Sequence, residues 1–170
     1  MSIAAVVLAA GEASRFGTPK QRLLLPEVLE RLEQSPVDEI VVVAGAHTLE
    51  TPARVVTCAG WKRGPGASLS AGLEELGDDV EAAVVVLADG PDLVPATVGR
   101  VIDAWRAGGG ELVAASYGGE RGHPLLVARE AWEAIPDAGL RQLEARLVPC
   151  DDLGAPGDVN TPADLPERLR

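Results

Sequence analysis

The sequence predicts an α/β fold, with a doubly wound, mostly parallel sheet between helices. Strand-like apolar runs alternate with helix-like segments along the chain, which is the pattern of such sheets. The first run, Ile3–Ala9, is apolar without interruption, as expected of a strand that is buried on both faces. The length of 170 residues suits a single domain with a full core, so we expect one domain over residues 1–170.

The elements are assigned in chain order. Strands are predicted at Ile3–Ala9, Glu39–Ala44, Arg54–Cys58, Ala82–Ala88, Glu111–Ala115 and Pro124–Ala128. Helices are predicted at Glu27–Gln34, Ser68–Leu76, Ala96–Ala107, Arg129–Ile135 and Leu140–Arg146. The bounds of the third helix are marked by Pro95, which suits a first turn, and by the glycines at 108–110, which end it.

Four polar loops adjoin the predicted strand ends, at residues 11–22, 59–68, 89–92 and 117–124. Ligands of open α/β sheets bind beyond the carboxyl ends of the strands. We therefore expect the functional residues in these loops.

The loop after the first strand has the composition of a phosphate site. Gly11 and Gly17 let backbone N–H groups approach an anion, and Arg15 and Lys20 add positive charge. Of 15 lysines and arginines in the chain only 2 are lysines, so a compact ammonium at Lys20 suits a point contact to phosphate oxygens. The alternative is that Lys20 is an ordinary solvated loop residue.

Composition limits the class of ligand. The net charge of −11 argues against nucleic acid, because a binder of the phosphate backbone needs a basic face. Residues 1–22 are nevertheless locally positive, with Arg15, Lys20 and Arg22 against Glu12. We therefore expect an anionic small molecule to bind at this end.

Nothing in the sequence indicates a membrane partner or secretion. No apolar run has the length of a membrane span, and residues 3–10 have the pattern of a strand without the basic region of a signal peptide. Cys58 and Cys150 stand alone, without metal-ligand spacing, as reduced thiols of a cytoplasmic protein would.

Asp89 directly follows an apolar strand. A carboxylate at that place is well positioned to hold a hard cation through oxygen ligands. The alternative is that Asp89 and Asp92 only stabilise the turn at Gly90-Pro91.

Further oxygen donors lie near the C-terminus. Thr161, Pro162 and Asp164 form an ordinary helix start, with Thr161 as the N-cap and Asp164 at the third position. This explanation does not cover Asp158 or Asn160.

Two more glycine-rich loops carry candidate residues. Ser68 precedes a predicted helix and suits either an N-cap or a ligand contact. His123 must be extended because Pro124 follows it, and the alternative role for a lone loop histidine is polar surface. No Ser-His-Asp or Cys-His set has supporting context, so covalent catalysis is not indicated.

Six segments, in this order, resemble the MobA-like nucleotidyltransferases, especially the molybdenum cofactor cytidylyltransferases. They are LAAGEASRFGTPKQRLL, GWKRGPGASLSAGL, VVVLADGPDLV, GGERGHPLLV, GLRQLEARL and GDVNTPADL. The resemblance implies a three-layer α/β/α domain with a mixed, mostly parallel seven-stranded sheet, like that of nucleotide-diphospho-sugar transferases.

The resemblance also implies roles for individual residues. The nucleotide would be bound by Leu8, Ala9, Ala10, Gly11, Ser14, Arg15, Lys20, Ser68 and Asp89. Of these, Arg15, Lys20 and Asp89 would be catalytic. Asp89 and Asn160 would hold Mg²⁺, and Gly122, His123 and Pro124 would border the acceptor.

The reaction implied is transfer of a nucleoside monophosphate, with CTP as the expected donor, onto a phosphate of molybdopterin or the molybdenum cofactor. CTP is expected because Ala10 stands where guanylyltransferase relatives usually have glycine, so its methyl narrows the space beside the base. One alternative is another phosphorylated acceptor, such as a sugar phosphate or a phospholactate-like molecule. GTP is the alternative donor. The other alternative function is a nucleotide-binding partner in cofactor assembly without catalysis, which the compact chain and Asn160 in place of aspartate would suit.

Overall fold

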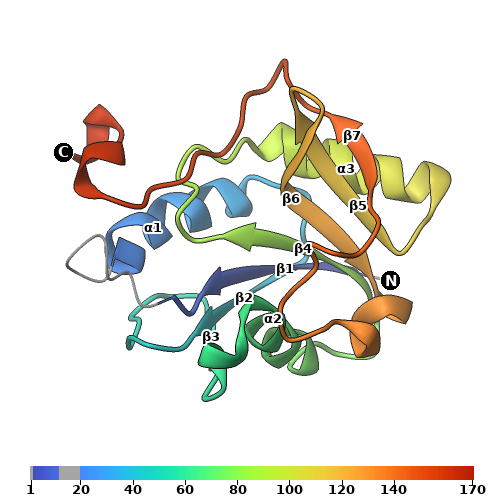
Figure 1. Ribbon diagram of the computed structural model, residues 1–170, viewed down its shortest axis with the longest axis horizontal. Helices are drawn as coiled ribbons and strands as arrows, with labels where there is room; N and C mark the ends of the chain where they lie inside the picture. Colours follow the sequence, from blue (N-terminus) through green and yellow to red (C-terminus); the bar gives the residue numbers. More distant parts are fainter. Residues whose placement is uncertain (1, 12–19) are drawn as a thin grey trace.

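The computed structural model describes residues 2–11 and 20–170 (Figure 1). The described strands form one seven-stranded sheet in the order β3-β2-β1-β4-β6-β5-β7. Their bounds are β1 Ser2–Ala9, β2 Glu39–Ala44, β3 Arg54–Thr57, β4 Val80–Leu87, β5 Leu112–Tyr117, β6 Glu120–Ala128 and β7 Arg146–Pro149. Strand β6 is antiparallel to both of its neighbours, and the remaining pairs are parallel. The predicted mixed, mostly parallel sheet is thus confirmed.

Helices cover both faces of the sheet. They are α1 Lys20–Glu33, α2 Pro65–Glu74, α3 Pro95–Gly108 and the 3-10 helices η1 Trp61–Arg63, η2 Arg129–Ala134, η3 Pro162–Asp164 and η4 Glu167–Leu169. Figure 1 shows α1 and α3 on one face and α2 on the other, which gives the three predicted layers.

The central strand β1 contributes to two hydrophobic cores. Ile3 and Val7 pack in the core beneath α1 and α3, whereas Ala4 and Val6 pack in the core beneath α2. Successive side chains of a strand point to opposite faces, so every position of β1 must be apolar. This is why the sequence shows an uninterrupted apolar run.

The antiparallel strand β6 follows from the hairpin that joins it to β5. Gly118 and Gly119 form its turn with φ angles of 61° and 79°, a conformation that favours glycine. The pairing of Val85 with Leu125 then brings the beginning of β6 beside the end of β4. Residues 120–123 therefore lie at the edge of the sheet where β1 and β4 end.

Helix α1 begins earlier than predicted. It runs from Lys20 and contains Pro26, whereas the prediction was Glu27–Gln34, after the proline. Pro26 lacks an N–H group, so it removes one hydrogen bond from the helix, to the carbonyl of Arg22. Burial of Leu24, Leu25 and Val28 outweighs this loss.

The predicted helix Leu140–Arg146 is wrong. Residues 140–145 form a short turn with bends and irregular structure, and β7 begins at Arg146 and pairs in parallel with β5. The guanidinium of Arg121 donates hydrogen bonds to the carbonyl oxygens of Leu140 (2.8 Å) and Leu143 (2.7 Å). Tertiary hydrogen bonds thus occupy carbonyl groups that would otherwise accept the hydrogen bonds of a helix.

The other differences concern bounds and helix type. Residues Arg129–Ala134 form a 3-10 helix, and α2 begins at Pro65, before the predicted Ser68. Strand β6 begins at Glu120, before the predicted Pro124. Among the described residues, no helix is long and apolar enough to cross a membrane.

Candidate functional site

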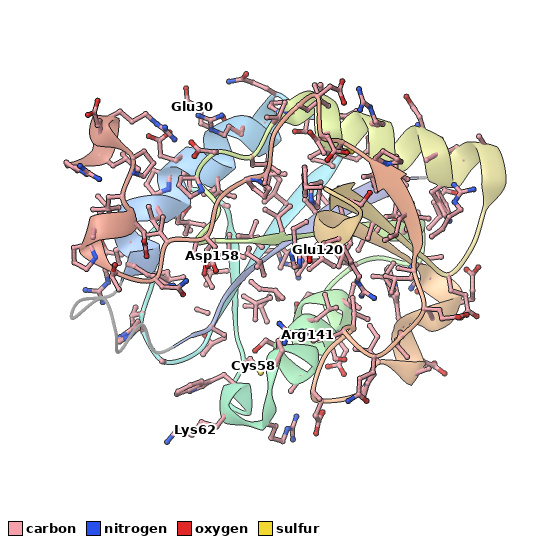
Figure 2. The ribbon with its side chains drawn as sticks, turned by 45° about the horizontal axis from the view of Figure 1, so that its top comes forward. Glu30, Cys58, Lys62, Glu120, Arg141 and Asp158 are labelled. Carbon is pink, nitrogen blue, oxygen red and sulfur yellow. The ribbon has the colours of Figure 1, made fainter. Side chains whose placement is uncertain are left out.

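Three segments meet at the edge where β1 and β4 end. The end of β1 is joined to the turn after β4 by a hydrogen bond from the Ala88 N–H to the Leu8 carbonyl, 3.1 Å long. Asp89 lies on this turn, and Lys20 opens helix α1 nearby. The C-terminal segment runs from β7 back across this edge toward α1, carrying Asp158 (Figures 1 and 2).

Lys20 joins all three segments. Its Nζ donates hydrogen bonds to Asp89 Oδ2 (3.2 Å) and to the carbonyl oxygen of Val159 (2.6 Å). The side chains of Lys20 and Asp89 are only 11% and 22% exposed, so this ion pair is largely shielded from water. The structure thus brings together the predicted catalytic pair Lys20 and Asp89.

The carboxyl group of Asp89 has one oxygen without a partner. Its Oδ1 is buried and makes no hydrogen bond, while Oδ2 accepts from Lys20. Burial raises the pKa of Asp89 above its usual value; Lys20 opposes this increase, and the nearby Asp158 adds to it. A buried carboxylate oxygen without a donor suits a hard cation, because Mg²⁺ and similar ions take oxygen ligands.

The C-terminal segment is fixed against the Asp89 turn by its backbone. The Val159 N–H donates to the carbonyl of Asp89 (3.0 Å), and the Asp92 N–H donates to the carbonyl of Pro156 (2.8 Å). Val159 itself is buried with Leu24 of α1. Asn160, the predicted second metal residue, directly follows Val159, and its Nδ2 donates to Asp158 Oδ2 at 3.0 Å.

The predicted helix start at Thr161 is confirmed. Asp164 Oδ2 accepts hydrogen bonds from the N–H groups of Asn160 (3.0 Å) and Thr161 (2.9 Å), and a capping box opens η3. Asp164 is therefore occupied with capping. Asp89 and Asp92 do more than stabilise the turn between them. Asp89 accepts a hydrogen bond from Lys20 (3.2 Å), and Asp92 accepts one from Arg168 (2.9 Å).

The first loop is described only in part. Leu8, Ala9 and Ala10 end β1 or follow it, and Gly11 is exposed after them. Ser14 and Arg15 lie outside the described residues. A Cβ at Gly45 would lie 2.9 Å from the Ala10 methyl and 2.7 Å from Trp61 Cβ, so the Ala10 methyl packs toward Gly45 and Trp61.

Ser68 is not an N-cap. The N-cap of α2 is Gly64, and Ser68 lies inside the helix, 3% exposed. Helix α2 begins earlier because Pro65 suits its first position, and the Gly66 N–H is bound by the carbonyl of Asp137 at 2.9 Å. The contact between Ser68 and a ligand stays a prediction.

The predicted acceptor residues lie in β6, at the same edge. His123 is partly buried, and it precedes Pro124 through a cis peptide bond. Its carbonyl accepts a hydrogen bond from the Tyr117 hydroxyl at 2.7 Å. Burial, with a smaller effect of Arg121, lowers the pKa of His123 to about 4. His123 is therefore a neutral, partly buried residue and not polar surface.

Sequence reasoning missed two features of this site. The Val159 carbonyl binds Lys20, but a backbone oxygen leaves no signal in a sequence. The charge of Asp158 helps to raise the pKa of Asp89, and the only signal for Asp158 in the sequence was that helix capping did not explain it. Within the described part of the chain, no group of three or more His, Cys, Asp or Glu residues could hold a metal ion.

A cavity of about 540 Å³ lies elsewhere, between α1 and residues 48–52. Its lining combines Leu25, Leu29 and Leu49 with the carboxylates of Glu30 and Glu50. It contains neither Lys20 nor Asp89. We place the candidate site at the strand ends, because the cation, the carboxylates and the turn backbone converge there.

Comparison with known proteins identifies the family of the chain. The model of the family described as the MobA-like NTP transferase domain matches residues 5–149. A Chloroflexus aggregans protein named "Probable molybdenum cofactor guanylyltransferase" is 35% identical over 129 residues, which are 69% of this chain and 60% of that protein. The match thus spans less than two thirds of that relative.

Solved structures share the fold. The crystal structure of a Mycobacterium sp. strain JC1 homolog of Rv0371c has a TM-score of 0.80 at 25% identity, covering 98% of this chain and 94% of that one. Rv0371c of Mycobacterium tuberculosis, in complex with manganese, has a TM-score of 0.69 at 25% identity, covering 97% and 93%. The expected nucleotide-diphospho-sugar transferase-like fold is confirmed.

Proposed function

Because the chain belongs to the MobA-like NTP transferase family, we propose that it transfers a nucleoside monophosphate from an NTP to a phosphate of a small acceptor. An acceptor phosphate oxygen attacks the α-phosphorus, the bond from the α-phosphorus to the bridging oxygen breaks, and pyrophosphate leaves. The observation that carries the proposal is the shielded Lys20–Asp89 pair, with its unpartnered Asp89 oxygen, at the ends of β1 and β4.

Lys20 neutralises charge on the triphosphate in this proposal. Its ammonium binds Asp89 and the Val159 carbonyl, and it lies at the edge of the sheet where a nucleotide would bind. Positioning and charge neutralisation suffice for phosphoryl-type transfer, without a covalent intermediate on the protein. Gly11, Ser14, Arg15 and Ser68 are the further proposed contacts to the nucleotide.

Asp89 and Asn160 are the proposed metal residues. The donor set fits Mg²⁺, since it offers a carboxylate with a buried, unpartnered oxygen and a nearby amide. When bound, the ion would supply positive charge that stabilises the phosphate oxygens and polarises the α-phosphate. A structural relative crystallised with manganese, which supports a divalent ion without selecting Mg²⁺.

The acceptor is proposed to be molybdopterin or the molybdenum cofactor. The name of the Chloroflexus aggregans relative supports this choice. The acceptor would lie along Gly122, His123 and Pro124, which lie in the first half of β6, near the end of β4. A sugar phosphate or a phospholactate-like molecule is the alternative phosphorylated acceptor.

CTP is the proposed donor, because the residue at position 10 is alanine. The Ala10 methyl lies beside Gly45, and it would narrow the space beside the base. GTP is the second candidate, since the Chloroflexus aggregans relative is named a guanylyltransferase. Competition binding decides between them: CTP should bind more tightly than GTP, and the reverse order would favour the guanylyl reaction.

Pyrophosphate release tests the proposal. The protein is incubated with Mg²⁺, molybdopterin and each NTP in turn, and the wild type is compared with Asp89→Asn. We expect release with one preferred NTP and at least a hundredfold loss in the variant, whose circular dichroism spectrum should stay unchanged. Nucleotide binding without release, for every acceptor class tried, would leave the non-catalytic partner role instead.

A further inference from the structure

A groove between α1 and residues 48–53 lies outside the candidate site. The cavity of about 540 Å³ adjoins a second cavity of about 340 Å³, and both are lined by Leu29, Glu33 and Pro52. The two cavities follow α1 from Arg22 to Glu33 and continue to residues 37–40. From Arg22 to Glu33 a helix advances about 17 Å, at about 1.5 Å a residue. An extended peptide of about five residues has the same length, at about 3.3 Å a residue.

A bridge between the two walls closes one end of the groove. The guanidinium of Arg22, on α1, donates hydrogen bonds to the carbonyl oxygen of Thr48 from Nε (3.1 Å) and from Nη2 (3.0 Å). These bonds hold the segment 48–52 against the helix. The groove therefore has a defined width at this end.

The floor of the groove is apolar. Leu25, Leu29 and Leu49 line it and are 2%, 5% and 7% exposed, so they are fixed in the core. Pro26 on α1 and Pro52 on the facing segment are exposed and line the two walls. An apolar side chain that enters the groove leaves water for these carbon surfaces, which favours binding.

The rim of the groove carries negative charge on both walls. Glu30 and Glu33 on α1 and Glu50 on the facing segment are exposed, and none of them forms an ion pair within the part of the chain that the structure describes. Arg22 is the cation among the described lining residues, and it is bound to a carbonyl oxygen. In Figure 2 Glu30 lies on α1, apart from Asp158 at the sheet edge. The rim is thus complementary in charge to a basic ligand and repels an acidic one.

We propose that this groove binds a basic segment of a partner protein in extended form. Successive side chains of an extended segment point to opposite sides, so alternating apolar and basic residues fit an apolar floor beneath an acidic rim. The length of the groove and the carboxylates on both walls favour a chain segment over a compact cation. The groove contains neither Lys20 nor Asp89, so this binding is independent of the proposed function.

Fluorescence anisotropy with a labelled heptapeptide of alternating leucine and arginine tests the proposal. The peptide is titrated with the full chain, and a second peptide carries serine in place of leucine. Wild type is compared with Glu33→Lys and with the control Glu133→Lys. Glu133 is exposed on η2 and does not line the groove, so both variants change the net charge equally. Glu33 is the exposed last residue of α1, where a lysine is compatible with the helix.

We expect Glu33→Lys to weaken binding of the leucine–arginine peptide at least tenfold, and Glu133→Lys to weaken it less than threefold. The serine–arginine peptide should bind wild type at least tenfold more weakly than the leucine–arginine peptide. Equal weakening by the two variants, equal affinity of the two peptides, or no binding of the leucine–arginine peptide overturns the proposal. Spermine that binds more tightly than the peptide, with the same dependence on Glu33, would identify a small cation as the occupant and also overturn it.

Discussion

Lys20 illustrates how one side chain serves both the fold and the proposed reaction. Its ammonium binds Asp89 and the Val159 carbonyl, and a triphosphate would add oxygens to the same group. Losing one charge-assisted contact to phosphate costs about 1.5–3 kcal/mol. Lys20→Ala should therefore weaken NTP binding at least tenfold by isothermal titration calorimetry, while Arg106→Ala, an exposed cation on α3, should leave it unchanged. Equal affinity in both variants would exclude Lys20 from the nucleotide site.

The same substitution also probes stability. The Lys20–Asp89 pair is mostly shielded, and its removal leaves Asp89 buried without its cation, at a cost of about 1–3 kcal/mol. Lys20→Ala should lower the urea midpoint at pH 7, and the loss should be smaller when Asp89→Asn is already present. Additive losses in this double-mutant cycle would mean that the two residues do not stabilise each other.

His123 gives the stability of the protein a dependence on pH. Its pKa is lowered to about 4 by burial, so the unfolded chain binds the proton more readily than the folded chain between pH 4 and about 6.5. Stability should therefore rise with pH across this window, and acidification should remove up to about 3 kcal/mol. Urea unfolding at pH 4.5, 5.5 and 6.5 measures this slope, which should be shallower in His123→Gln. Parallel slopes in the two proteins would contradict the assignment.

At the level of elements, two helical glycines should respond in opposite directions to alanine. A Cβ at Gly66, in α2, would lie 1.7 Å from the Pro136 carbonyl oxygen, so the start of α2 would have to separate from residues 136–139. A Cβ at Gly99, in α3, would meet only Pro36, with Cγ at 3.6 Å and Cδ at 3.9 Å, which are ordinary contacts. Gly99→Ala should stabilise by about 0.5–1 kcal/mol, whereas Gly66→Ala should destabilise by more than that. Thermal unfolding of both variants checks the pair, and equal shifts would contradict it.

At the level of the whole molecule, the proposed metal and nucleotide should bind as a unit. The site offers few protein ligands, and Mg²⁺ usually completes its shell with water and phosphate oxygens. Mg²⁺ alone should therefore shift the melting temperature little. Both ligands at a hundredfold excess over their joint dissociation constant should stabilise the fold by about 2.7 kcal/mol. Full stabilisation by Mg²⁺ without nucleotide would contradict the proposed site, and differential scanning calorimetry distinguishes the cases.

The sequence by itself determined the local features. The uninterrupted apolar run of β1, the limits of α3 at Pro95 and Gly108, and the capping of η3 by Asp164 follow from patterns within a few residues. Such patterns are readable because burial on two faces, helix ends and caps depend on neighbouring side chains. They were enough to predict the class of fold and the candidates Lys20 and Asp89.

Only the tertiary structure decided which of these residues meet. Lys20 contacts Asp89 across 69 positions of sequence and Val159 across 139, and no local pattern encodes such distances. The segment 140–146 shows the same limit: Arg121 of β6 takes its carbonyl groups, so a helix-like sequence becomes turns and the start of β7. Contacts between distant segments outweigh local propensity wherever burial and hydrogen bonding contribute more than helix preference, and here they also bond the Val159 N–H to the Asp89 carbonyl.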